Sequence, residues 1–172
     1  MKTLLILRHA KSSWADSDLD DHERPLNARG EKDAPRMGQF AREAHLYPEL
    51  IVSSDAVRAR LTATAVAAAT GGQLLLDPRL YHASTDEILD ALQSVLQDDT
   101  LKDSAVQRDV ATVMIVGHNP GLEVLIAQLT GEQEALPTAA LAQLALPIDR
   151  WSDLNTSTRG TLVGLWRPKE LP

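Results

Sequence analysis

The sequence predicts a three-layer α/β/α sandwich built around a mostly parallel central sheet. Near-continuous apolar runs alternate with amphipathic segments, and helix start and stop signals lie between them. Strands buried on both faces of a parallel sheet are apolar throughout, and their alternation with helices is typical of this fold class. The 172 residues contain no internal repeat, low-complexity tract or linker. Because a chain of this length can bury one core, we expect a single domain over residues 1–172.

Short apolar runs are the predicted strands. Four of them have the composition of parallel strands buried on both faces, namely residues 3–8, 50–53, 74–76 and 112–117. Residues 139–147 and 160–167 are predicted to form two further strands, a hairpin-like pair with the Trp151 region between them. Residues 98–109 are polar and are predicted to form a solvated connection.

The first two predicted helices are bounded by recognisable signals. One begins after Asn27, a residue type that caps helix N-termini, and runs to about Ala44 with Met37 and Phe40 on its apolar face. The next follows the cap Ser53-Ser54-Asp55 at residues 53–55, is rich in alanine, and ends at Gly71-Gly72. Glycine is the residue most often found just beyond a helix C-terminus.

The other two predicted helices lie later in the chain. One opens with a capping box at residues 84–87 and carries apolar residues at helical spacing from Ile88 to Leu96. The other packs four residues on one face, namely Leu122, Leu125, Ile126 and Leu129.

Composition excludes several classes of function. A net charge of -7 argues against an extended nucleic-acid interface, because such binding depends on neutralising phosphates. The absence of cysteine excludes disulfides, thiol nucleophiles and cysteine-ligated zinc. The apolar run before Arg8 is shorter than the roughly 7 to 15 residues of a secretory signal, and no run approaches the roughly 18 residues of a membrane span. We therefore expect no membrane contact and a cytoplasmic location.

Charged and titratable residues follow the predicted strands where those strands end. Arg8 and His9 close the first strand, and His118 closes the strand at residues 112–117. In open α/β sheets, ligands bind outside the carboxyl ends of the strands, so these side chains are expected to share one site. Arg58, in the first turn of a helix, and Arg24, in the loop after the first strand, are expected to join them. Such a pocket favours a dianion.

Four segments carry a resemblance to a known family. "LRHA", "RPLNARG", "VSSDAVRARLTA" and "VGHNPG", in this order within residues 3–126, resemble the motifs of the histidine phosphatase superfamily. The short chain is similar to the SixA-type phosphohistidine phosphatases within it. The resemblance implies a phosphoglycerate mutase-like fold and a phosphatase that works without a metal or cofactor.

The resemblance also assigns roles to residues. The nucleophilic histidine of the family matches His9, which is followed by Ala10 where the family usually has glycine. Its phosphate-binding positions match Arg8, Arg24, Arg58 and His118. We therefore predict catalytic roles for His9, Arg8, Arg58 and His118, and substrate binding by Arg24, Arg8, Arg58 and His118.

The chemistry of phosphoryl transfer calls for these residue types independently. A neutral imidazole can attack phosphorus and form a phosphohistidine that water later hydrolyses. The transition state spreads charge over three equatorial oxygens, which guanidinium groups are suited to bind. A metal-dependent hydrolase is disfavoured because the histidines lack a local ligand spacing such as H-x-x-x-H.

The substrate prediction depends on a proton donor. The stretch "DPRLYHAS", where larger family members have a carboxylic acid, contains His82 and no glutamate. An imidazole leaving group needs little proton assistance, whereas an alkoxide needs a strong acid. The predicted substrate is therefore a phosphohistidine-containing protein, such as a histidine phosphotransfer domain. Two alternatives stay open: a small-molecule phosphatase or mutase whose acid would be Asp86 or Glu87, and a non-catalytic phosphate-binding module.

Several other polar or aromatic residues are predicted to have structural roles only. Residues 11–14, just after His9, are expected to form a surface loop, although they could line the pocket mouth. Trp151 and Trp166 are expected to pack in the core or hairpin. Four arginines are expected to be solvated on helix faces, namely Arg29, Arg36, Arg42 and Arg60.

Overall fold

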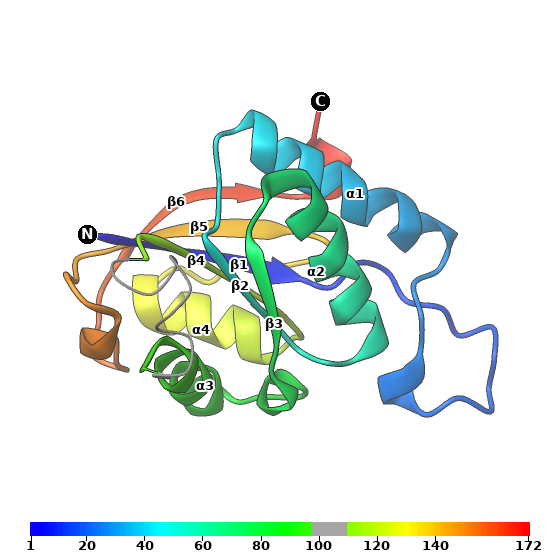
Figure 1. Cartoon of the computed structure of the whole chain (residues 1–172), viewed down its shortest axis with the longest axis horizontal. Coiled ribbons are helices and arrows are strands. Elements are labelled where there is room, and N and C mark those ends of the chain that lie inside the picture. The colour runs from blue at the N-terminus through cyan, green and yellow to red at the C-terminus, as the bar shows by residue number, and fades with distance from the viewer. Residues whose placement is uncertain (98–109) are drawn as a thin grey trace.

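The computed structural model describes residues 1–97 and 110–172, and the predicted solvated connection at 98–109 lies outside the described residues. A six-stranded sheet forms the centre of the fold, with strand order β3-β2-β4-β1-β5-β6 (Figure 1). The strands are β1 (Lys2–Arg8), β2 (Leu50–Ser53), β3 (Gln73–Leu76), β4 (Thr112–Gly117), β5 (Leu141–Leu146) and β6 (Thr161–Trp166).

Strand directions confirm the mostly parallel sheet. Strands β3, β2, β4 and β1 run parallel, while β5 pairs antiparallel with both β1 and β6. The four predicted parallel strands and the hairpin-like pair are therefore confirmed. In the register of β1 and β4, Arg8 lies opposite Gly117, so His9 and His118 leave the sheet side by side at the same edge.

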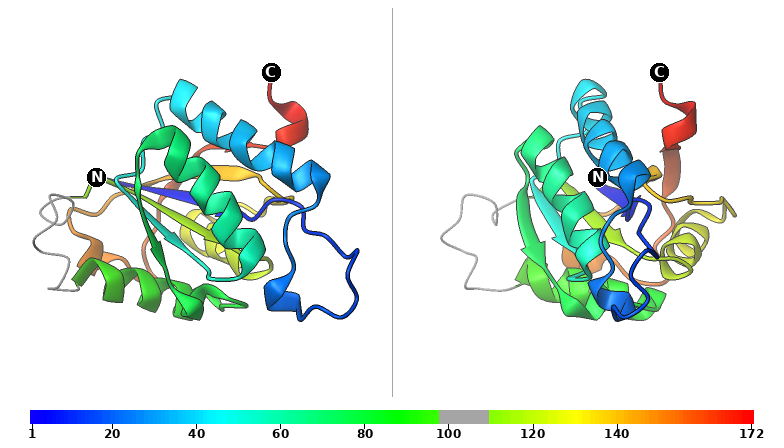
Figure 2. Two further views of the ribbon diagram at one scale, coloured as in Figure 1. Left: turned by 45° about the vertical axis from the view of Figure 1, so that its right-hand side comes forward. Right: turned by 90° about the vertical axis from the view of Figure 1, so that its right-hand side faces the viewer.

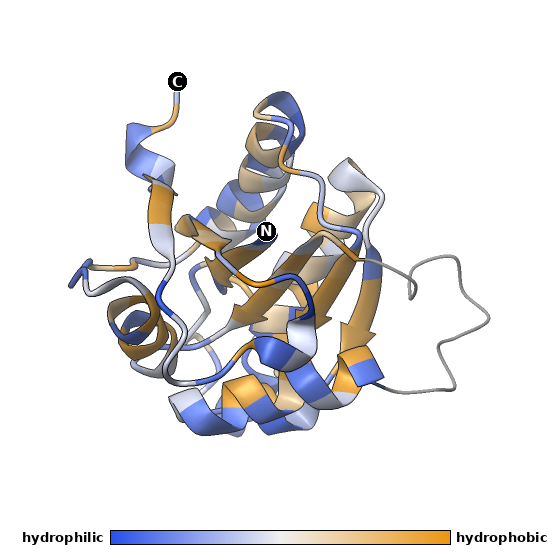
Figure 3. Ribbon diagram, turned by 90° about the vertical axis from the view of Figure 1, so that its left-hand side faces the viewer, coloured by the Kyte–Doolittle hydropathy of each residue, from blue (hydrophilic) through white to orange (hydrophobic). Residues whose placement is uncertain are grey.

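Helices cover both faces of the sheet. Helices α1 (Ala28–Glu43) and α2 (Val57–Thr70) pack together on one face, and α3 (Thr85–Gln97) and α4 (Gly121–Thr130) pack together on the other (Figure 2). The orange strands of the sheet lie between helices that carry both blue, hydrophilic and orange, hydrophobic residues (Figure 3). The three-layer α/β/α sandwich is confirmed. Among the described residues, no helix has the length and apolar content needed to cross a membrane.

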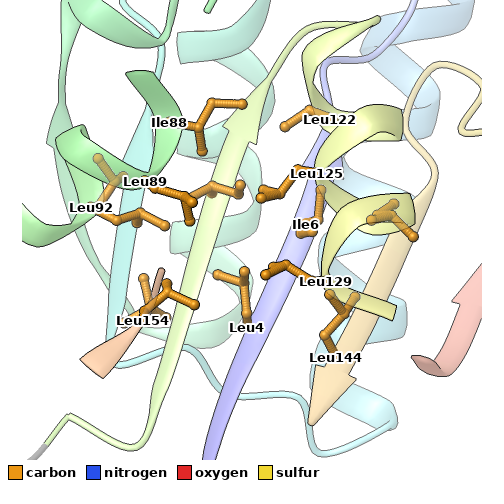
Figure 4. Packing of buried hydrophobic residues seen from close by; sticks show 14 of the residues in the cluster. Leu4, Ile6, Ile88, Leu89, Leu92, Leu122, Leu125, Leu129, Leu144 and Leu154 are labelled. Atoms are coloured by element: carbon orange, nitrogen blue, oxygen red, sulfur yellow. The ribbon is translucent and has the colours of Figure 1, made fainter. Parts of the chain in front are cut away.

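Strand β1 shows why buried strands are apolar throughout. Leu4 and Ile6 belong to the core beneath α3 and α4, where they pack with Leu89 and Leu125 (Figure 4). Leu5 and Leu7 point to the other face and pack in the core beneath α1 and α2. Since successive side chains of a strand alternate between the two faces, both sets must be apolar.

Most predicted helix boundaries are confirmed. The Asn27 side chain accepts a hydrogen bond from the N–H of Gly30, 2.9 Å away, and Gly71 ends α2 in the left-handed region with φ 82°. At α3, the N–H of Ser84 donates to Glu87 Oε2 at 2.8 Å, as a capping box requires.

The predicted side-chain cap of α2 is wrong. The helix begins at Val57, and its N-cap residue, Ala56, makes no side-chain cap bond. The Ser54 hydroxyl lies 2.8 Å from Nε2 of His118 and accepts from the N–H of Ala56. Ser54 therefore connects the start of this helix to the end of strand β4.

One of the four arginines predicted to be solvated has a different role. The guanidinium of Arg36 is half-buried and donates to the carbonyl oxygens of Pro168 and Leu171, at 2.9 and 2.8 Å. It thus holds the last residues of the chain against α1, and the prediction is wrong for this residue. The other three are exposed as predicted, namely Arg29, Arg42 and Arg60.

The two tryptophans pack as predicted. Trp151 is buried, and its indole N–H donates to the carbonyl oxygen of Val110 at 2.7 Å. Trp166 is half-buried, and its ring centroid lies 5.2 Å from that of Phe40 on α1. Both therefore contribute to the packing around the β5 and β6 pair.

Candidate active site

A pocket of about 290 Å³ lies at the carboxyl ends of β1 and β4. It brings together all five residues that the sequence placed at one site. Its lining residues are Arg8, His9, Lys11, Ser12, Trp14, Asp21, Arg24, Arg58, His82, His118, Asn119 and Thr138. They come from strand ends, the first turn of α2 and three loops, because these segments meet at the same edge of the sheet.

The geometry around His9 leaves one ring nitrogen free. Its side chain is buried, and Nδ1 lies 2.7 Å from the carbonyl oxygen of Ala10. A carbonyl can only accept, so Nδ1 carries the proton and Nε2 keeps its lone pair. Burial, assisted by the positive charges of Arg58 and Arg8, lowers the pKa of His9 to about 4. The imidazole is therefore neutral at physiological pH, as a nucleophile must be.

His118 lies beside His9, with ring centroids 5.1 Å apart. Its Nδ1 lies 3.4 Å from Nη2 of Arg58, and its Nε2 lies 2.8 Å from Oγ of Ser54. Because a guanidinium only donates, Nδ1 of His118 is the acceptor and Nε2 carries the proton. Burial, together with the positive charges nearby, lowers the pKa of His118 to about 3. Both histidines are therefore neutral.

Arg8 and Arg58 keep donors that no group of the described residues accepts. Nη1 of Arg8 donates to the carbonyl oxygen of Leu136 at 3.1 Å, and Nη1 and Nη2 of Arg58 both donate to Asp21. The Nε atoms of both arginines are buried and lack a hydrogen-bond partner among the described residues. An unsatisfied buried N–H is costly, so these two donors call for an acceptor that the described residues do not supply.

Arg24 is also buried, but its donors face protein oxygens. Its Nε and Nη2 lie 3.0 and 2.9 Å from Oδ1 of Asp21. Its Nη1 donates to Oγ of Ser12 at 2.8 Å and approaches the carbonyl oxygen of Ser13 at 3.3 Å. The ring of Trp14 covers the guanidinium, with its centroid 3.5 Å from Cζ. Arg24 thus borders the pocket while being tied to the loop around it.

Asp21 is the charged residue of the site that sequence reasoning missed, together with the lining residues Asn119 and Thr138. Its Oδ2 accepts from Tyr81 and Arg58, at 2.6 and 3.0 Å, and its Oδ1 accepts from Arg24. These hydrogen bonds, the one from Tyr81 first, hold the pKa of Asp21 far below its usual range. Nothing in the segment "DLDDHERP" distinguishes this aspartate from Asp20, which the sequence presents equally.

The pocket mouth differs from the sequence prediction. Lys11 and Trp14 line the pocket rather than a separate surface loop. The carbonyl oxygen of Lys11 accepts from the N–H of Asn27 at 2.9 Å, which folds this loop back beside α1. A Cβ at Gly30 would lie 2.1 Å from that oxygen, so only glycine allows the close approach.

His82 reaches the pocket, whereas the two proposed proton donors, Asp86 and Glu87, do not. Its ring stacks on His118 at a centroid distance of 5.9 Å, and its Nε2 lies 3.5 Å from Oδ2 of Asp21. Glu87 instead accepts from Ser84 in the capping box, and neither it nor Asp86 lines the pocket.

We expect the two buried histidines to make stability depend on pH. The unfolded chain binds these protons near pH 6.5, whereas folded His9 and His118 bind them only near 4 and 3. Protonation therefore favours the unfolded state, and their contribution is lost as the pH falls from about 6.5 through 4. Unfolding midpoints measured between these pH values should fall less steeply in the double variant His9→Asn/His118→Asn than in the wild type. Equal slopes would contradict the neutral state of the pair.

Comparison with known sequences identifies the family. The profile of the histidine phosphatase superfamily (branch 1) matches residues 4–93. An uncharacterized chloroplastic protein of Arabidopsis thaliana, At3g52155, is 33% identical over 158 residues, which are 88% of this chain and 70% of that protein. The uncharacterized protein Rv1276c of Mycobacterium tuberculosis is 28% identical over 176 residues, covering 95% of this chain and all of that protein (100%).

Solved structures share the fold over nearly the whole chain. A protein of Agrobacterium tumefaciens, whose assignment as the phosphohistidine phosphatase SixA is provisional, is 29% identical with a TM-score of 0.76, covering 97% of this chain and 98% of that one. A SixA protein histidine phosphatase complexed with tungstate has a TM-score of 0.76 at 22% identity, covering 99% of both chains. The mycobacterial glucosyl-3-phosphoglycerate phosphatase Rv2419c has a TM-score of 0.63 at 17% identity, covering 94% of this chain and 97% of that one.

The last two likenesses, below 25% identity, show the fold alone. That fold is the phosphoglycerate mutase-like one that the four sequence motifs implied. With the family profile and the Arabidopsis relative, these findings place the chain in the histidine phosphatase superfamily, among its SixA-type members.

Proposed function

We propose that this protein is a phosphatase that removes the phosphoryl group from phosphohistidine in a partner protein, through a covalent phosphohistidine on Nε2 of His9. The observation that carries the proposal is the state of Asp21, which is the only carboxylate among the described residues that line the pocket. Its hydrogen bonds from Tyr81, Arg24 and Arg58 favour the ionised form, so it holds no proton to donate. This site suits a leaving group that needs no strong acid.

In the proposed first step, Nε2 of His9 attacks the phosphorus atom while the bond to the partner's imidazole nitrogen breaks. The electron pair of that bond stays on the departing ring, which leaves as neutral imidazole because its other nitrogen carries a proton, and neutral imidazole is far more stable than an alkoxide. The free donors of Arg8 and Arg58 bind the phosphoryl oxygens, and His118 stays next to the nucleophile. In the second step, water attacks phosphorus and the bond to Nε2 of His9 breaks, with its electron pair returning to the imidazole ring. Both protons of the water leave with inorganic phosphate.

The mouth of the pocket supports a protein substrate. Trp14 is 72% exposed, and the His82 side chain is 60% exposed, so the lining reaches the outer surface. A phosphohistidine side chain extends only a short way from the surface of a partner protein, so the pocket must be open to that surface. The cytoplasmic location and the single domain over residues 1–172 remain parts of this proposal.

Phosphate release from two substrates tests the proposal. A ³²P-labelled histidine phosphotransfer domain and an aryl phosphate ester would each be mixed with the wild-type protein in the presence of a chelator. We expect turnover of the phosphohistidine protein to be much faster. Preference for the ester would overturn the substrate assignment, and binding of phosphate without turnover of either substrate would favour the phosphate-binding module.

A second candidate function is hydrolysis of a small phosphomonoester, which the position of His82 favours. An imidazolium at the pocket mouth is able to protonate an alkoxide leaving group. The fold also accommodates this chemistry, as the name of the glucosyl-3-phosphoglycerate phosphatase indicates for that protein.

The variant His82→Asn separates the two functions. Asparagine tolerates the positive φ of 53° at this position. If His82 is a general acid, ester hydrolysis should fall by about a hundredfold, whereas hydrolysis of phosphohistidine should change little. His45→Asn is a matched control, since His45 is exposed at a helix end with φ 57°. Equal losses with both substrates would show that His82 is not a leaving-group acid.

A further inference from the structure

The guanidinium of Arg24 is bound to the protein on every side. Its three nitrogens face Asp21, Ser12 and Ser13, and the Trp14 ring covers its plane. Its side chain is 8% exposed. Arg58 differs, because its buried Nε has no partner among the described residues. The two arginines therefore have different capacities to bind a phosphoryl group.

Asp21 joins these two guanidinium groups. Its Oδ1 faces Arg24, while its Oδ2 and its own carbonyl oxygen accept from Nη2 and Nη1 of Arg58, at 3.0 and 2.6 Å. Two donors of Arg58 are thus fixed on one residue of the loop after β1. This two-point attachment, with the 3.4 Å contact between Nη2 and Nδ1 of His118, fixes the plane of the Arg58 guanidinium and hence the direction of its other N–H donors.

We propose that Arg24 and Asp21 form a positioning pair that acts on phosphate through Arg58, rather than binding it directly. Arg24 holds the Asp21 carboxylate against Ser12 and Ser13, and Asp21 holds the guanidinium of Arg58 in its place in the pocket lining. The inference rests on the proposed function in that Arg58 is taken as a phosphate ligand. It reassigns the predicted substrate-binding role of Arg24.

The substitution Arg24→Lys distinguishes positioning from direct binding. Lysine keeps the positive charge, but a single ammonium group cannot reproduce the contacts that the fork makes on Asp21 and Ser12 together. A direct ligand that works as a point charge would be largely rescued by lysine. A positioning fork would not, and loss of charged hydrogen bonds predicts phosphate binding weaker by about tenfold to a hundredfold.

A double-mutant cycle supplies the decisive readout. Calorimetric titration with inorganic phosphate at fixed salt would measure affinity for the wild type, Arg24→Lys, Asp21→Asn, Arg58→Gln and the two doubles that contain Arg24→Lys. We expect Arg24→Lys to change affinity by less than about twofold in either background, because the connection to phosphate is already broken there. An undiminished effect in those backgrounds, or unchanged affinity in the single variant, would overturn the positioning pair.

Two controls keep the outcomes separate. Arg167→Lys removes a fork that donates to Glu134 away from the pocket, and it should leave phosphate affinity unchanged. If Arg24→Lys prevents folding, as an unfolding scan would show, Ser12→Ala removes one acceptor of the same fork and takes its place in the cycle. A wild type that does not bind phosphate would refute the proposed function itself. If the wild type binds phosphate, and Arg24→Lys weakens binding as much in the Asp21→Asn and Arg58→Gln backgrounds as in the wild type, only this inference is refuted.

Discussion

Replacement of His9 by alanine is expected to abolish phosphate release from a phosphohistidine protein while the chain stays folded. Removal of a nucleophile that forms a covalent intermediate should lower the rate by at least about a thousandfold. The fold should survive because the imidazole makes one hydrogen bond, to Ala10, and lies at the edge of the sheet rather than in either apolar core.

Covalent labelling makes this prediction specific. After mixing with the ³²P-labelled substrate and rapid quenching, the wild type should carry label and His9→Ala should not. His45→Asn, at an exposed helix end, should be labelled like the wild type. Label on the alanine variant would remove His9 as the nucleophile, and loss of its cooperative unfolding transition would contradict the placement of His9 outside the cores.

Replacement of Arg58 by glutamine is expected to weaken phosphate binding and to slow turnover by about a hundredfold or more, the loss typical of one transition-state donor. Both should change because the guanidinium acts on charge that is already present in the bound substrate. Its loss should also raise the pKa of His9, since the charge of Arg58 helps to lower it.

Three measurements check the role of Arg58: titration with phosphate, the steady-state rate, and the NMR titration of the His9 ring. Arg60→Gln is the matched control, because Arg60 lies on the same helix and is exposed. Unchanged phosphate affinity in Arg58→Gln would exclude this residue from the phosphate site. An unchanged pKa of His9 would show that the charge of Arg58 does not act on the His9 ring.

The fold was largely predictable because its signals are local. Apolar runs predict buried strands, and the cap at Asn27 and the capping box at Ser84 predict helix starts, all of which the structure confirms. These signals depend on side-chain periodicity and on backbone groups a few residues away. The predicted cap of α2 was wrong because it depended on a contact that is not local: the Ser54 hydroxyl is directed to His118, from a distant segment.

The candidate site was predictable wherever a residue ends a strand. Arg8, His9 and His118 could be placed together from the sequence, because the carboxyl ends of parallel strands meet at one edge. Residues in loops could not be placed in this way. The loop after β1 has its course set by contacts such as that of Lys11 with Asn27, which no periodicity encodes.

The sequence by itself therefore determined the layered fold, the family and the group of histidines and arginines at one sheet edge. Only the tertiary structure decided how the charges of that group are distributed. Burial makes both histidines neutral, and Asp21, which looks like any loop aspartate in the sequence, becomes the shared partner of Arg24 and Arg58. The physical reason is that pKa values and guanidinium directions depend on desolvation and on partners from distant segments, which only the folded chain brings together.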